Sequence, residues 1–228
     1  MRVLAIGDIH GCLAPLNLLL DRVKPTGDDL LVTLGDYVDR GPDSKGVLDR
    51  LIELRRHLNL VCLRGNHEQM MADAVRGTRA DKKMWLGVGG VETLLSYGLG
   101  PGRSETLAAI PREHWEFLDR ALVNYHETEH FIFAHATVLP DLAMPDQPDY
   151  ALLWEFLPDE MRHFSGKTVI CGHTNQKSGV PKVVPGAACI DTSAYKNGWL
   201  TCLDATSGRY WQADLLGRER EGHLDYEE

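Results

Sequence analysis

Short apolar runs that end in polar residues alternate with helical patterns in the first part of the chain. The apolar runs cover residues 2–6, 30–34 and 59–63. Between them, apolar residues recur every three or four positions over residues 13–23 and 44–58, which predicts amphipathic helices. Strands that alternate with helices predict an α/β sheet with parallel members covered by helices.

The middle of the chain changes to a helical pattern that glycines interrupt. Helices are predicted over residues 69–75, 91–97 and 112–122, with breaks at residues 87–90 and 98–102. We expect this block to form a helical lobe beside the sheet.

Strand patterns return in the last part of the chain. Residues 122–126 and 130–134 predict a β-hairpin. Residues 217–228 are highly charged, and we expect a frayed, flexible tail there. No linker divides the chain, so a single domain is predicted over residues 1–216. Further strands are predicted over residues 168–171, 187–190, 199–203 and 209–212.

The length and net charge of the chain limit which class of protein it can be and which partners it can bind. A chain of 228 residues can bury a substantial core. The net charge of −9 opposes a non-specific grip on nucleic acid, so we expect no nucleic-acid partner. No apolar run approaches the roughly 20 residues of a membrane span, and Asp8 interrupts any signal-peptide core. We therefore expect a cytoplasmic protein without a membrane partner; the oligomeric state stays open.

Five cysteines without a C-x-x-C spacing do not indicate a disulfide framework. Four of them lie in apolar runs and are expected to be buried. Cys12 follows a polar loop directly, so both a packing role and redox sensitivity stay open for it.

Ligand-type side chains follow five of the predicted strands. A single histidine at a strand end is usually structural, but five strand ends that offer such residues indicate a shared site. Carboxylate, amide and imidazole groups together suit manganese, iron or zinc better than magnesium or calcium. Two metal ions that share one carboxylate would lower the pKa of a bridging water and clamp oxygens at phosphorus. The residues are Asp8 and His10; Asp36, Asp39 and Arg40; Arg64, Asn66 and His67; His135; and His173.

Three of these segments carry a resemblance to a known family. Residues 7–11 (Gly-Asp-Ile-His-Gly), 35–41 (Gly-Asp-Tyr-Val-Asp-Arg-Gly) and 65–68 (Gly-Asn-His-Glu) resemble the signature motifs of the phosphoprotein phosphatases. Those enzymes lie within the calcineurin-like metallophosphoesterases, and this chain is similar to the compact bacterial ones. Residues 135–136 and 172–173 resemble the two later histidine motifs. The resemblance implies a four-layer fold, in which helices flank a central β-sandwich that holds the metals at one end.

The resemblance also implies the metal ligands. Two divalent ions are expected, with Mn²⁺ first and iron or zinc as alternatives. A metal-bridging hydroxide would then attack phosphorus directly, without a phosphoenzyme. Position by position, Asp8 and His10 would bind the first metal, Asp36 would bridge both, and Asn66, His135 and His173 would complete the second.

His67 is expected to act beside the metals as the general acid. It immediately follows Asn66, so a ligand role for Asn66 leaves His67 next to the shell of ligands. The resemblance implies that Asp39 orients His67, and that Arg40 and Arg64 hold the phosphate oxygens.

One expected arginine is missing from its usual place. The family commonly carries another phosphate-binding arginine near a Leu-Trp pair between the two later histidines. Residues 153–156 read Leu-Trp-Glu-Phe, and the next arginine is Arg162. Either Arg162 replaces the missing contact from a displaced loop, or the contact is absent and Arg162 lies on the surface.

The leading functional hypothesis is a protein phosphatase that acts on phosphoserine or phosphothreonine in a phosphoprotein or phosphopeptide, with phosphotyrosine as a further candidate. The alternative enzyme is a diadenosine tetraphosphate hydrolase, which usually has alanine at the position of Asp39. A non-catalytic binding module with structural metals is a third hypothesis, although none of the expected ligands is missing. The acidic net charge disfavours a nuclease.

Overall fold

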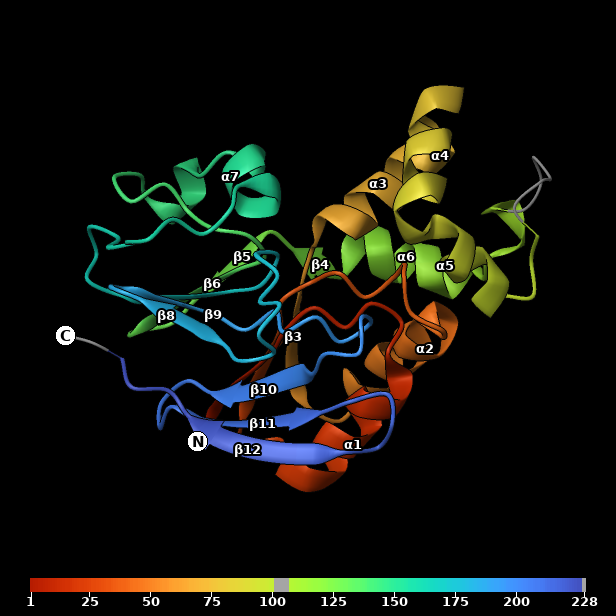
Figure 1. Ribbon diagram of the computed structural model, residues 1–228. Coiled ribbons are helices and arrows are strands. Elements are labelled where there is room, and N and C mark those ends of the chain that lie inside the picture. Colours follow the sequence, from red (N-terminus) through yellow and green to blue (C-terminus); the bar gives the residue numbers. More distant parts are fainter. Residues whose placement is uncertain (101–106, 227–228) are drawn as a thin grey trace.

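Two β-sheets form the centre of the molecule, and helices cover their outer faces (Figure 1). The computed structural model describes residues 1–100 and 107–226. The larger sheet has the order β12 (Glu219–His223), β11 (Arg209–Ala213), β10 (Leu200–Asp204), β1 (Val3–Ile6), β2 (Leu30–Thr33), β3 (Asn59–Leu63) and β4 (Leu122–Val123). The smaller sheet has the order β5 (Tyr125–Glu127), β6 (Phe131–Ala134), β7 (Thr168–Cys171), β9 (Ala187–Cys189) and β8 (Lys182–Val184).

Helices form the two outer layers of the fold. The outer face of the larger sheet shares a hydrophobic core with α1 (Leu13–Val23), α2 (Ser44–Leu54) and α6 (Arg112–Arg120). The outer face of the smaller sheet packs against η3 (Met144–Asp146) and α7 (Asp149–Trp154). This arrangement confirms the predicted four-layer fold. In the described part of the chain, no helix is both long and apolar enough to cross a membrane.

The strand β1 shows why its sequence is a continuous apolar run. Leu4 and Ile6 point into the core shared with the helices, whereas Val3 and Ala5 point into the core between the two sheets. A strand that is buried on both faces requires apolar residues at every position.

The parallel strands place their carboxyl ends at one edge of each sheet. β1, β2 and β3 are parallel neighbours, and so are β6, β7 and β9. The loops that follow β1, β2, β3, β6 and β7 therefore carry the polar residues predicted as ligands.

The middle of the chain is a helical lobe of α3 (Asn66–Arg76), α4 (Arg79–Trp85), η1 (Leu86–Gly90) and α5 (Val91–Ser96), followed by η2 (Leu107–Ala109). α4 was not predicted because its sequence is mostly charged; Thr78 caps it by accepting hydrogen bonds from Ala80 and Asp81. The break predicted at residues 87–90 is confirmed as a kink: the segment forms a π-helical turn in which Gly89 has non-helical angles, φ 129° and ψ 0°. Of the break predicted at residues 98–102, positions 101–102 lie outside the described residues.

The hairpin predicted over residues 122–134 is only partly correct. β5 and β6 form an antiparallel pair, as predicted. β4, however, pairs in parallel with β3 in the other sheet. Leu122 contributes to the core beneath the helices, so the chain changes sheets directly after β4.

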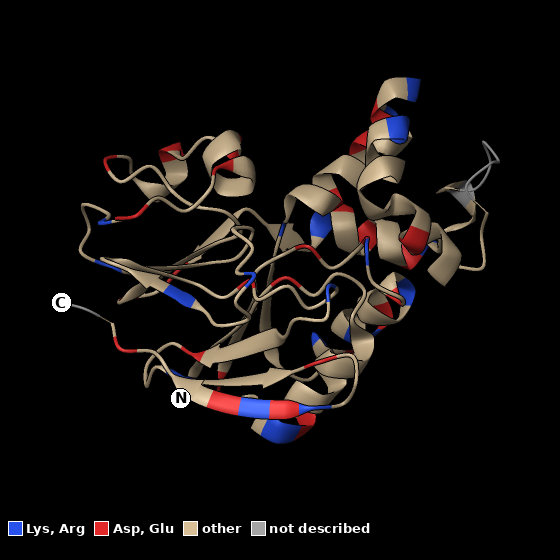
Figure 2. Cartoon of the chain, in the orientation of Figure 1, with Lys and Arg blue, Asp and Glu red and all other residues tan. Residues whose placement is uncertain are grey.

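The charged C-terminal tail requires a correction. Residues 219–223 form β12, whose pairing with β11 runs from Arg209↔His223 to Ala213↔Glu219. Charged residues line this strand (Figure 2), which lies at the edge of the larger sheet. An edge strand tolerates such a sequence because one side faces solvent. Leu224 is only 5% exposed and anchors the segment in the core between the sheets.

All five cysteines are buried free thiols. Cys12 is fully buried, and its Sγ donates a hydrogen bond to the carbonyl of His10 at 3.4 Å. Burial raises the pKa of the Cys12 thiol to about 12. A buried thiol that resists ionisation supports the packing role over redox sensitivity.

Candidate metal centre

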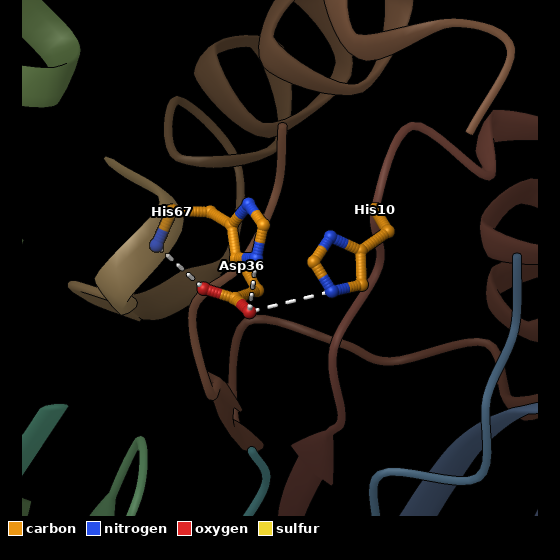
Figure 3. Close-up of side chains that lie close together, drawn as sticks. All are labelled: His10, Asp36 and His67. Atoms are coloured by element: carbon orange, nitrogen blue, oxygen red, sulfur yellow. Dashed lines mark hydrogen bonds and ion pairs between the residues drawn. The ribbon is translucent and has the colours of Figure 1, made fainter. Parts of the chain in front are cut away.

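The site lies where the carboxyl ends of β1, β2, β3, β6 and β7 meet. Figure 3 shows Asp36 between the rings of His10 and His67. The structure brings together every predicted metal ligand and the predicted acid with its partner. Those that are less than 7% exposed are Asp8, His10, Asp36, Asp39, Asn66, His67 and His135; His173 is partly buried.

Asp36 occupies the middle of the cluster. Its Oδ2 lies 3.3 Å from Nε2 of His10, and its Oδ1 lies 3.4 Å from Nε2 of His135. Two groups of potential ligand atoms, each within 4.8 Å of one another, share Asp36: one also contains His10 and His67, the other Asp8 and His135. Because the Asp36 carboxylate belongs to both groups, it lies where a carboxylate that bridges two metal ions would have to lie.

The pKa of Asp36 reflects this position. Burial would raise it, but the nearby rings of His135, His67 and His10 outweigh burial and hold the pKa well below its usual value. The Asp36 carboxylate is therefore ionised at neutral pH, as a metal ligand must be.

The imidazole tautomers fit a metal centre. Nδ1 of His10 lies 2.9 Å from the carbonyl of Val38, and Nδ1 of His135 lies 2.8 Å from the carbonyl of Leu34. Because a carbonyl can only accept, each Nδ1 is the donor, and each Nε2 keeps a lone pair directed at Asp36. Such second hydrogen bonds orient metal-binding histidines.

The other candidate ligands complete the set of donors. The backbone N–H of His173 donates to both oxygens of Asp8 at 3.1 and 3.2 Å. Oδ1 of Asn66 lies 3.1 Å from Nε2 of His135. Burial, followed by Asp191 and Asp36, raises the pKa of Asp8 well above its usual value. Several buried carboxylates gathered at one place fit a site for divalent cations.

His67 has the geometry of a proton donor. Its Nδ1 lies 2.6 Å from Oδ2 of Asp39, whereas its Nε2 is buried and has no hydrogen-bond partner among the described residues. Burial lowers the pKa of His67, but Asp36 and Asp39 outweigh it, so the pKa is raised overall. Nε2 lies 3.9 Å from Oδ2 of Asp36, beside the candidate ligands.

Asp39 is held by two residues that the sequence did not identify. Nε1 of Trp85 donates to both Asp39 oxygens at 3.0 Å, and the Thr93 hydroxyl donates to Oδ1 at 2.7 Å. Both residues come from the helical lobe. No local sequence signal marks them, because they lie 46 and 54 positions from Asp39.

Glu68 fixes the loop that carries Asp36. It is fully buried and accepts backbone hydrogen bonds from Asp36, Tyr37, Val38 and Gly65. Burial, followed by Asp36, raises its pKa to about 7. Its place at the end of the third motif was the signal that could have identified it.

The loops at the site adopt strained backbone conformations. Asp36, Asp39 and Arg40 have φ values of 50°, 71° and 68°, and His10 and His173 have 43° and 57°. Residues other than glycine rarely adopt this left-handed backbone conformation, and such strain concentrates at functional sites. Gly41 is required for close approach, since a Cβ there would lie 1.8 Å from the carbonyl of His10.

The guanidinium of Arg40 lies beside the candidate ligands, where an anion could be held. Nη1 of Arg40 lies 3.0 Å from Nε2 of His10 and 3.2 Å from the Tyr195 hydroxyl. Arg64 follows β3 and is partly buried. Tyr195, which the sequence did not identify, also packs edge-on against His10 at a ring distance of 5.0 Å.

Arg162 does not reach the site. Its backbone packs against Gly186, directly before β9, and its Nε donates to Glu160 at 3.1 Å. β9 runs parallel to β7, so the start of β9 lies at the opposite end of the sheet from His173. The prediction that Arg162 replaces the missing phosphate-binding arginine is therefore wrong.

Comparisons with known proteins give two curated relatives. A symmetrical bis(5'-nucleosyl)-tetraphosphatase of Pseudomonas syringae pv. syringae (strain B728a) is 35% identical over 141 residues, 61% of this chain and 43% of that protein. Serine/threonine-protein phosphatase 1 of Salmonella typhimurium is 43% identical over 92 residues, 39% of this chain and 38% of that protein. The chain thus spans less than half the length of either curated relative.

Structural similarity extends over nearly the whole chain. A crystal structure provisionally described as a diadenosine tetraphosphatase has a TM-score of 0.64 and 21% identity, and the alignment covers 97% of this chain and 93% of that one. At this identity, the likeness concerns the fold. The model of one protein family, the calcineurin-like phosphoesterases, matches residues 1–177, which include every candidate ligand. The chain belongs to the calcineurin-like phosphoesterase family.

Proposed function

We propose that this phosphoesterase hydrolyses phosphoserine and phosphothreonine in proteins, with two divalent metal ions as cofactors. The observation that carries the proposal is the buried pair of His67 and Asp39, in which Nδ1 and Oδ2 lie 2.6 Å apart while Nε2 makes no hydrogen bond to a described residue. A serine or threonine alkoxide is a poor leaving group, so its departure benefits from a proton donor.

The side chains divide the reaction between them. Nε2–H of His67 protonates the leaving oxygen, while Asp39 holds the ring and stabilises its charged form. Arg40 and Arg64 hold the phosphate oxygens, and water attacks phosphorus directly. Metal ions bound by Asp8, His10, Asp36, Asn66, His135 and His173 would supply Lewis acidity and lower the pKa of water.

A second candidate substrate is a dinucleoside tetraphosphate. The matched Pseudomonas syringae relative carries that activity in its name, and its match covers more of this chain than the Salmonella match does. The comparisons therefore support this substrate more than a phosphoprotein. The presence of Asp39 supports a phosphomonoester substrate, because Asp39 holds the general acid His67. The leaving phosphate of a tetraphosphate is more acidic than a serine hydroxyl, so its departure needs less help from a general acid.

A direct comparison of substrates tests the proposal. Full-length protein with Mn²⁺ should hydrolyse a phosphoserine peptide with a higher kcat/KM than diadenosine tetraphosphate. Hydrolysis of the dinucleotide alone would replace the first proposal by the second. Absence of hydrolysis on both substrates and on para-nitrophenyl phosphate would indicate a non-catalytic binding module.

Isotopic labelling tests direct attack by water. In a single turnover in ¹⁸O-water, one labelled oxygen should enter the released phosphate, and ³²P from the substrate should not remain on the protein. Label retained on the protein would show a phosphoenzyme and would exclude direct attack.

A further inference from the structure

Two buried side chains of the helical lobe fix the carboxylate of Asp39. Trp85, the last residue of α4, and Thr93, in α5, are fully buried, as is Asp39 itself. Nε1–H of Trp85 donates to both oxygens of Asp39, and the Thr93 hydroxyl donates to Oδ1. Oδ2 also accepts from Nδ1 of His67, 2.6 Å away. The two donors from the lobe therefore determine which oxygen faces the imidazole.

A buried carboxylate needs such donors to keep one orientation. The terminal torsion of an aspartate side chain is broad, so the side chain alone does not fix the direction of its oxygens. A buried oxygen that loses its donor is costly, and the carboxylate then turns towards another partner. Trp85 and Thr93 are neutral donors, so they orient Asp39 and leave His67 as its cationic partner.

Thr93 holds the backbone of Asp39 as well. Its Oγ1 accepts a hydrogen bond from the N–H of Asp39 at 2.8 Å, and the hydroxyl of Ser44 accepts from the same N–H at 3.1 Å. Asp39 has a φ of 71°, a conformation that persists only where the surrounding structure fixes it. Thr93 thus supports both the strained main chain of Asp39 and its carboxylate.

The π-helical turn η1, between Trp85 and Thr93, holds the next residue of the loop. The N–H of Arg40 donates to the carbonyl of Gly89 at 3.2 Å, and Nε of Arg40 donates to the carbonyl of Val88 at 3.4 Å. Gly89 allows this close approach, since a Cβ there would lie 2.6 Å from the backbone nitrogen of Arg40. One segment of the lobe, residues 85–93, therefore fixes the loop that carries Asp39.

We infer that Trp85 and Thr93 are positioning residues for the general acid: they hold Asp39 so that Nε2–H of His67 stays directed at the leaving oxygen. The inference rests on the proposed hydrolysis of phosphomonoesters, in which His67 donates that proton. Trp85 and Thr93 act through Asp39 and do not touch the reacting atoms. Loss of either donor should therefore weaken proton transfer and leave the binding of phosphate unchanged.

The leaving group separates this role from a purely structural one. A serine alkoxide needs a proton to depart, whereas para-nitrophenolate departs with little help from an acid. Thr93→Val, which removes the hydroxyl and keeps the branched shape, should lower kcat of the Mn²⁺-loaded protein on a phosphoserine peptide about tenfold. On para-nitrophenyl phosphate, kcat should change less than about twofold, and KM should hold for both substrates. Thr93→Ser should restore kcat, and Trp85→Phe should behave like Thr93→Val.

Ser96→Ala is the matched control in the same helix. Its hydroxyl donates to the carbonyl of Thr93 at 2.7 Å and so supports α5 without holding the carboxylate of Asp39. This variant should keep the wild-type ratio of the kcat values for the two substrates. Equal losses on both substrates in Thr93→Val, or no loss on either, would overturn the inference.

Nuclear magnetic resonance tests the inference without turnover. In Zn²⁺-loaded protein labelled with ¹⁵N-histidine, the short bond between His67 and Asp39 should give a far-downfield Nδ1–H resonance, assigned by its loss in His67→Asn. Thr93→Val should shift or remove this resonance, and Ser96→Ala should keep it. An absent resonance in the wild-type protein, or an unchanged one in Thr93→Val, would overturn the inference. If the wild-type protein hydrolyses neither phosphomonoester, the proposed function fails, and the resonance still decides the inference.

Discussion

At the scale of single residues, hydrogen bonds separate the acid from the candidate ligands. His10 and His135 donate Nδ1–H to backbone carbonyls and aim Nε2 at Asp36. His67 instead donates Nδ1–H to the carboxylate of Asp39. A carboxylate partner stabilises the protonated imidazolium that a proton donor needs. A backbone carbonyl partner instead orients a neutral imidazole, which is the form that binds a metal ion.

Replacement of His67 tests its role as the acid. His67→Asn should lower kcat on a phosphoserine peptide by about 10² to 10⁴-fold, because the leaving oxygen loses its proton donor. Metal content, measured by mass spectrometry, should not change. A kcat near the wild-type value would exclude the role.

The pH dependence tests Asp39. Asp39 contributes to the raised pKa of His67, so Asp39→Asn should lower that pKa. The acid must be protonated, and activity is therefore lost as pH rises through its pKa. The alkaline limb of the kcat profile should move to lower pH by about one unit. Asp119→Asn, on the exposed face of α6, serves as the control; an unmoved limb in Asp39→Asn would contradict the coupling.

At the scale of elements, an ion pair between Arg2 and Asp29 joins the starts of two strands whose other ends carry the site. Asp29 precedes β2 and accepts hydrogen bonds from the backbone N–H and Nε of Arg2, which precedes β1, at 3.0 and 3.2 Å. Nη2 of Arg2 completes the ion pair at 2.6 Å. This contact joins the starts of two parallel strands that carry Asp8 and Asp36 at their other ends.

Stability at different pH values tests this contact. Arg2 lowers the pKa of Asp29, so the stabilisation is complete above the unfolded-state pKa near 3.9 and is lost as pH falls through the lower folded-state value. Asp29→Asn should cost about 1 to 3 kcal/mol at pH 7, and the difference from wild type should shrink below about pH 4.

Urea denaturation measures the free energy of unfolding at both pH values. Glu53→Gln, which removes the exposed ion pair with Arg50, is the control. That control should change the free energy of unfolding by less than about 0.5 kcal/mol. A pH-independent difference for Asp29→Asn would contradict the ion-pair explanation.

Elements with a clear periodicity were predictable, and those stabilised by distant contacts were not. The apolar runs identified β1 and β2, which are buried at every position, and β3, which is buried at its end. β12 escaped prediction because its charged sequence forms a strand only by pairing with β11. α4 escaped for a similar reason, since its only strongly buried residue is Trp85, which contacts Asp39.

At the scale of the whole molecule, the four layers bring five separate strand ends to one site. The sequence predicted that the candidate ligands lie close together because each of them follows an apolar run within a few residues. It did not predict Thr93, Trp85 or Tyr195, because their roles depend on how the helical lobe and the C-terminal loops pack. The placement of Arg162 failed for the same reason: its position depends on the turn before β9.

Metal stoichiometry tests the central claim, that Asp36 joins two ions in one centre. Protein loaded with Mn²⁺ and freed of excess metal should contain two ions per chain by mass spectrometry. Asp36→Asn, which removes the shared carboxylate while keeping its size, should retain less than one ion per chain and lose phosphatase activity. A single ion in the wild-type protein, or two ions retained in Asp36→Asn, would contradict the account.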